Sequence, residues 1–156
     1  MGTQEGASMK EESVKAEHAL ILRRRFGAPA ERVFQALTRP GELRRWFGPS
    51  ETYRVPVVEV DLRPGGAYRI ELHSPEGNVF RLAGIYREVL PPHRLAYTWR
   101  WEGEEDIGET LVTIDLREAG GGTDLSITQA PFSTEDARKR HEAGWSGSLS
   151  RLESIF

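Results

Sequence analysis

Residues 133–156, STEDARKRHEAGWSGSLSRLESIF, decide the fold. Ser133 or Thr134 can cap a helix, and Glu135 and Asp136 in the first turn favour the helix dipole. Apolar positions then recur at spacings of three and four, which predicts one amphipathic helix of about five turns. The positions on this stripe are Ala137, His141, Trp145, Leu149, Leu152 and Phe156.

In the residues before this helix, apolar side chains recur with a period of two. Alternating or apolar runs predict strands at about 18–26, 53–62, 67–72, 79–90, 94–101, 109–118 and 123–129. Pro64-Gly65-Gly66 and Gly120-Gly121-Gly122 suit tight turns between strands, because proline presets φ and glycine accepts positive φ. A phosphate-binding loop would need a longer glycine frame ending in Lys-Ser or Lys-Thr, which is absent at Pro64-Gly65-Gly66.

Two short helices interrupt this pattern after the first strand. Val33, Phe34 and Leu37 recur at helical spacing after Pro29, and a second short helix ends at Trp46-Phe47-Gly48. The order is therefore one strand, two short helices, six strands and a long helix. This order predicts an α+β fold in which a curved antiparallel sheet wraps around the terminal helix.

Length and composition indicate one soluble domain. The 156 residues include 21 basic and 24 acidic side chains, so the net charge of -3 offers no basic surface for nucleic acid. Residues 1–16 are polar and are expected to form a flexible tail before a single domain at 17–156. With no signal peptide and no membrane span, a cytoplasmic location is expected.

The residues with catalytic potential do not form a known constellation. The chain has no cysteine, and His18, His73, His93 and His141 are far apart, so no metal site or cofactor is predicted. The acidic run at Glu102, Glu104, Glu105 and Asp106 is expected to be a solvated hairpin loop. The segment 144–148 lacks the second glycine of a nucleophile elbow and lies within a helix.

His141 and Trp145 can be read in two ways. Both face the sheet, so His141 is either a general base or ligand contact, or a packed histidine bonded to a neighbouring group. Spacing identifies no carboxylate partner that would orient His141, which favours the packed interpretation. Gly144 is expected to permit close approach of helix and sheet.

Several segments together resemble one known family. They are APAERVFQALTRPGELRRWFGP at 28–49, VDLRPGGAYRIEL at 60–72, G84-x-Y86-x-E88, P91-x-x-R94-L95-x-Y97-T98, the GGGT turn and H141-x-x-G144-W145-x-x-x-L149. The chain resembles bacterial homologues of the heat-shock-protein-90 ATPase activator, in the START-like (SRPBCC) superfamily. The resemblance implies a helix-grip, birch-pollen-allergen-like fold. Relatives in the superfamily bind lipids, polyketides or hormones, or cyclise polyketides.

The resemblance directs attention to the aromatic residues. In a helix-grip fold, a cavity for a small hydrophobic or aromatic molecule can form between the sheet and the last helix. The candidate wall consists of Trp46, Phe47, Tyr97, Trp99, His141 and Trp145, although ordinary core packing would also explain each ring. We expect binding without catalysis. The alternatives are a cyclase-like enzyme that uses His141 with Tyr97, or a module that regulates a chaperone. The sequence is also compatible with a homodimer.

Overall fold

The computed structural model describes residues 18–156, so the polar tail expected at 1–16 lies outside the described residues. Seven strands and three helices follow the predicted order. They are β1 (Leu20–Phe26), α2 (Ala30–Thr38), α3 (Pro40–Trp46), β2 (Arg54–Val60), β3 (Ala67–His73), β4 (Val79–Leu90), β5 (Arg94–Trp101), β6 (Thr110–Ala119), β7 (Gly122–Ala130) and α4 (Glu135–Glu153).

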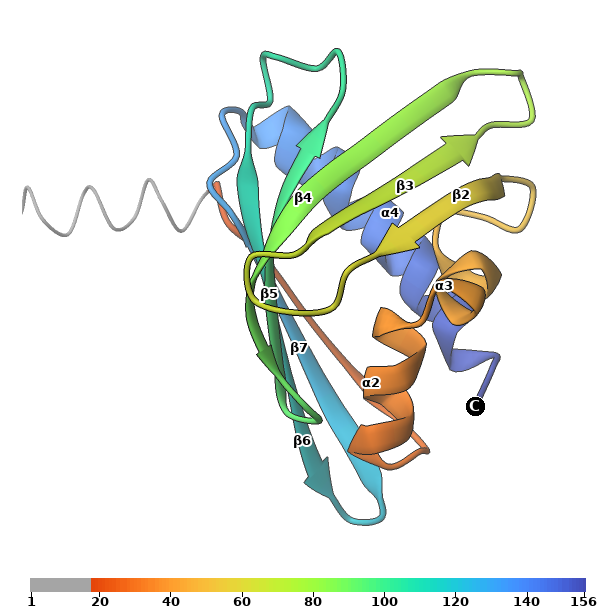
Figure 1. Cartoon of the computed structure of the whole chain (residues 1–156), viewed down its shortest axis with the longest axis vertical. Helices are drawn as coiled ribbons and strands as arrows, with labels where there is room; N and C mark the ends of the chain where they lie inside the picture. The colour runs from red at the N-terminus through yellow and green to blue at the C-terminus, as the bar shows by residue number, and fades with distance from the viewer. Residues whose placement is uncertain (1–17) are drawn as a thin grey trace, which may run out of the picture.

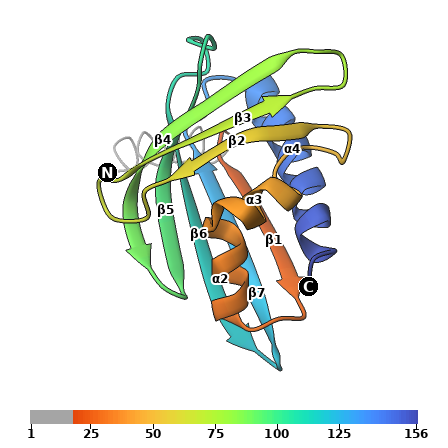
Figure 2. The ribbon, with the colours of Figure 1, turned by 45° about the vertical axis from the view of Figure 1, so that its right-hand side comes forward.

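The strands form one antiparallel sheet in the order β1-β7-β6-β5-β4-β3-β2. In Figure 1, α2 and α3 lie to the right of β6, and β2, β3 and β4 reach across α4. The view in Figure 2 shows the same crossing of α4 by β3 and β4. The predicted helix-grip fold is therefore confirmed: a curved seven-stranded sheet encloses the C-terminal helix.

Both predicted glycine turns join strands. Gly65 has a φ of 86°, and the amide of Asp61 donates to the carbonyl oxygen of Ala67, which closes the β2–β3 hairpin. Gly120 and Gly121 have φ values of 57° and 80° between β6 and β7. These positive φ values are accessible to glycine at little steric cost, which explains why glycine occupies the turns.

The apolar stripe of α4 faces the sheet as the sequence predicts. Ala137, Trp145, Leu149 and Leu152 are each buried, and His141 is half-buried. The Thr134 hydroxyl accepts a hydrogen bond of 3.1 Å from the amide of Ala137, so Thr134 is the cap. This stripe sets which helix residues can reach the space enclosed by the sheet.

A buried polar chain ties α4 to the sheet. Trp145 Nε1 donates to Gln129 Oε1 at 2.8 Å, and Gln129 Nε2 donates to the Thr110 hydroxyl at 2.8 Å. Gln129 on β7 is fully buried, and Thr110 on β6 is also buried. Because a buried polar group without a partner is costly, these bonds hold Trp145 in one orientation.

A second set of bonds ties α4 to the loop after α3. The Ser148 hydroxyl donates to the carbonyl oxygen of Gly48 at 2.9 Å and accepts from the Gly48 amide at 3.1 Å. The Arg151 guanidinium donates to the carbonyl oxygens of Phe47 and Ser50 at 3.1 and 3.0 Å. These contacts fix the loop that carries Phe47 against the helix.

Candidate functional site

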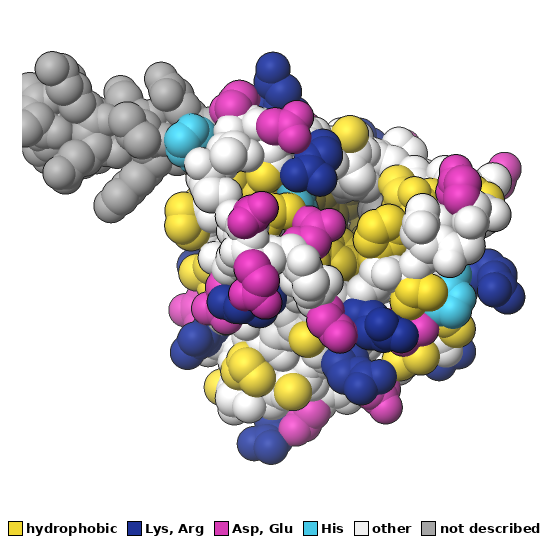
Figure 3. Space-filling model, turned by 90° about the horizontal axis from the view of Figure 1, so that it is seen from above, with side chains coloured by type: hydrophobic (Ala, Val, Ile, Leu, Met, Phe, Trp, Pro, Cys, Tyr) yellow, Lys and Arg dark blue, Asp and Glu magenta, His cyan; other side chains and the backbone are white. Residues whose placement is uncertain are grey.

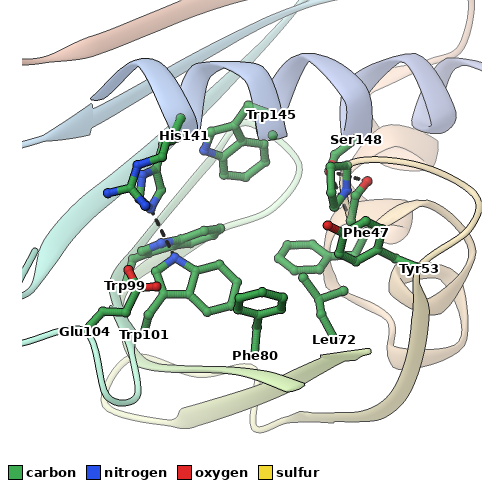
Figure 4. Close-up of a pocket in the computed structure, with 14 residues that line it drawn as sticks. Phe47, Tyr53, Leu72, Phe80, Trp99, Trp101, Glu104, His141, Trp145 and Ser148 are labelled. Carbon is green, nitrogen blue, oxygen red and sulfur yellow. Dashed lines mark hydrogen bonds between the residues drawn. The ribbon is translucent and has the colours of Figure 1, made fainter. Parts of the chain in front are cut away.

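A cavity of about 310 Å³ lies between α4, strands β3, β4 and β5, and the loop after α3. Viewed from above in Figure 3, hydrophobic side chains are visible in a hollow framed by acidic and basic ones. The close-up in Figure 4 shows α4 on one side of the cavity and the aromatic rings of the sheet on the other. The apolar wall of the cavity consists of Phe47, Tyr53, Leu72, Phe80, Trp99, Trp101 and Trp145.

Four of the six predicted site residues line this cavity: Phe47, Trp99, His141 and Trp145. The other two, Trp46 and Tyr97, line a separate space of about 20 Å³ beneath α2 and α3. The cavity thus takes its aromatic wall from the end of β5, from β4, from α4 and from the loop between α3 and β2.

Trp46 and Tyr97 lie apart from the cavity for local reasons. Trp46 is fully buried, and its Nε1 donates to the carbonyl oxygen of Ala36 at 2.8 Å, which binds α3 to α2. Tyr97 packs edge-on against Tyr68 and Tyr86, and burial raises its pKa. Both side chains therefore pack beneath the helix pair.

His141 has both ring nitrogens engaged. Trp101 Nε1 donates a hydrogen bond of 3.1 Å to His141 Nε2 (Figure 4). Since an indole nitrogen can only donate, Nε2 is the acceptor, and Nδ1 carries the hydrogen donated to the carbonyl oxygen of Ala137 at 2.8 Å. Burial lowers the pKa of His141, so the imidazole is neutral at pH 7.

Trp99 occupies the centre of the aromatic wall. Its ring centroid lies 5.4 Å from that of Trp145, 5.6 Å from that of Trp101 and 6.0 Å from that of Phe47. Trp99 is 5% exposed, and its Nε1 has no hydrogen-bond acceptor among residues 18–156. The wall is therefore a continuous cluster of rings with one unpaired N–H.

The two glycines of α4 have different surroundings, and those of Gly144 differ from the prediction. A Cβ at Gly144 would meet no atom within 4 Å, and Gly144 lines the cavity. The expectation that Gly144 permits close packing is therefore wrong, because it leaves space instead. Gly147 has the packing role: a Cβ there would overlap the carbonyl oxygen of Pro49.

Ten lining residues of the cavity fall outside the predicted set, and five of them carry its apolar wall and its acidic end. Tyr53, Leu72, Phe80 and Trp101 complete the apolar wall, and Glu104 lines one end. Trp101 lies two residues after Trp99 on the same strand, so both side chains point to the same face of the sheet. This spacing could have identified Trp101 as a lining residue. Leu72 and Phe80 are cross-strand partners on β3 and β4, and only the curvature of the sheet brings them under α4.

Residues 18–156 contain no group of three His, Cys, Asp or Glu side chains that could hold a metal ion. Within the same range, no helix is both long and apolar enough to cross a membrane.

The sheet, the enclosing helix and the apolar cavity together define a helix-grip domain of the START-like, SRPBCC type. A family model described as "Activator of Hsp90 ATPase homolog 1-like protein" matches residues 27–156, and the chain belongs to this family. No curated protein matches the chain significantly.

Solved structures agree with this assignment. Protein CV1439 from Chromobacterium violaceum is 33% identical with a TM-score of 0.82, over 88% of this chain and 96% of that one. Protein NE0264 from Nitrosomonas europaea is 30% identical with a TM-score of 0.76, over 90% and 94%. CalU16 from Micromonospora echinospora is 30% identical with a TM-score of 0.66, over 86% and 73%.

Proposed function

We propose that this protein binds a small hydrophobic or aromatic molecule in the cavity between the sheet and α4, without catalysing a reaction. The observation that carries the proposal is the pairing of polar groups in the aromatic wall. His141, Trp145, Trp101 and Ser148 use their polar atoms on one another or on neighbouring protein groups. The wall therefore offers a ligand mainly ring surfaces, which favours apolar binding.

The same bonds weigh against a catalytic role for His141. A general base needs a free acceptor, but His141 Nε2 already accepts from Trp101. The proposed proton partner, Tyr97, forms no hydrogen bond with His141 and lines a different space. A cyclase-like activity through His141 Nε2 would require the hydrogen bond from Trp101 to break when substrate binds.

Two experiments test the proposal. Native mass spectrometry of protein purified without detergent would reveal a co-purifying molecule, and solvent extraction would identify it. Binding itself can be measured with N-phenyl-1-naphthylamine, an uncharged dye whose fluorescence rises in an apolar environment.

The matched variants are Gly144→Leu and Ala143→Leu. Gly144→Leu places a side chain in the cavity, whereas the neighbouring Ala143 is exposed and does not line it. We expect Gly144→Leu to weaken dye binding at least about tenfold, a loss of about 1.4 kcal/mol, and Ala143→Leu to bind as the parent does. Full dye binding by a folded Gly144→Leu protein, verified by circular dichroism, would contradict the proposal.

A further inference from the structure

One end of the cavity carries a carboxylate without a partner. Glu104, in the loop between β5 and β6, lines the cavity. Among residues 18–156, the side chain of Glu104 forms no hydrogen bond and no ion pair. Figure 4 shows Glu104 at the same end as Trp101 and His141. A carboxylate beside apolar rings favours a positively charged partner.

The cationic side chain that lines the cavity, Arg140, is paired with a carboxylate that does not line it. The Arg140 Nε lies 3.2 Å from Asp136 Oδ2, one turn earlier on α4. His141 is neutral at pH 7 because burial lowers its pKa. Among the charged groups that line the cavity, the Glu104 carboxylate is therefore the one without an ion-pair partner in residues 18–156.

The aromatic wall adds to this preference. Three indole rings, those of Trp99, Trp101 and Trp145, line the cavity with Tyr53 and two phenylalanines. The faces of such rings carry negative partial charge, and tryptophan attracts cations most strongly. A partly desolvated ammonium group is stabilised by ring faces and a carboxylate together, whereas an anionic group is repelled by both.

We infer that the cavity selects ligands with a positively charged amine on a flat apolar body, the ammonium group lying beside Glu104 and the body among the rings. This inference rests on the proposed binding function and names the chemical class of the ligand.

The inference is tested with three probes that share one bicyclic ring. They are 1-naphthylmethylamine, which is a cation at pH 7, neutral 1-naphthalenemethanol and anionic 1-naphthoate. Isothermal titration calorimetry at low ionic strength gives the three values of Kd. We expect the amine to bind about tenfold more tightly than the alcohol, and the carboxylate to bind most weakly.

Two variants measure the contribution of Glu104 to this preference. Glu104→Gln should lower the ratio of the alcohol Kd to the amine Kd from about ten to about two or three, because only the ring faces then favour the cation. Glu105→Gln removes the same charge from the same loop, but Glu105 does not line the cavity and lies 3.9 Å from Arg100. This control should keep the ratio near ten, as in the parent protein.

The outcomes separate the inference from the proposed function. Equal binding of amine and alcohol, tightest binding of the carboxylate, or an unchanged ratio in Glu104→Gln would overturn the charge preference and leave apolar binding intact. Failure of all three probes to bind would overturn the proposed function, and the charge preference with it.

Discussion

At the scale of single residues, His141 in the cavity wall makes the stability of the protein depend on pH. Its pKa is lowered by burial, and less strongly by Arg140, while the hydrogen bond to Ala137 and the charge of Glu104 oppose this shift. The unfolded chain therefore binds a proton at higher pH than the folded one. Since stability rises with pH wherever the unfolded state binds more protons, the free energy of unfolding should fall as pH drops below about 6.5.

The variant His141→Gln tests this linkage. One proton contributes at most about 1.4 kcal/mol for each pH unit between the unfolded and folded pKa values. Urea unfolding at pH 7 and pH 5 should show that the parent loses more stability than His141→Gln does. Equal losses in both proteins would show that His141 does not carry the linkage.

At the scale of one element, α4 contains two glycines with opposite roles. We predict that Gly144→Ala stabilises the protein by up to about 1 kcal/mol, because alanine favours the helix and its methyl group enters empty space. Gly147→Ala should destabilise it by about 1–3 kcal/mol, because its methyl group overlaps the Pro49 carbonyl. Thermal unfolding of the pair checks both signs, and stabilisation by Gly147→Ala would contradict the observed packing.

At the scale of the whole molecule, the chain Trp145–Gln129–Thr110 joins the helix layer to the sheet layer. Gln129→Met leaves the buried indole N–H of Trp145 without an acceptor, and we expect a loss of about 1–3 kcal/mol in the free energy of unfolding. Thr128→Met, on the exposed face of β7, is the control and should change stability by less than about 0.5 kcal/mol. Similar losses in both variants, measured by urea unfolding, would contradict this role for Gln129.

The fold could be predicted at this same scale, because hydrophobic periods and glycine turns mark each element and their order admits few architectures. The site was predicted only in part. Strand parity correctly grouped Trp99 with the inward face, but it could not separate Tyr97, which packs beneath α2 and α3. Leu72 and Phe80 reach the cavity through sheet curvature, and sequence spacing does not encode that curvature.

The distribution of tryptophans gives the molecule a built-in optical reporter. The chain contains four tryptophans, and three of them, Trp99, Trp101 and Trp145, line the cavity. The fourth, Trp46, is fully buried outside it and bonded to Ala36. A non-fluorescent occupant would contact three of the four indoles and change their emission. Binding can therefore be followed by the intrinsic fluorescence of the unlabelled protein.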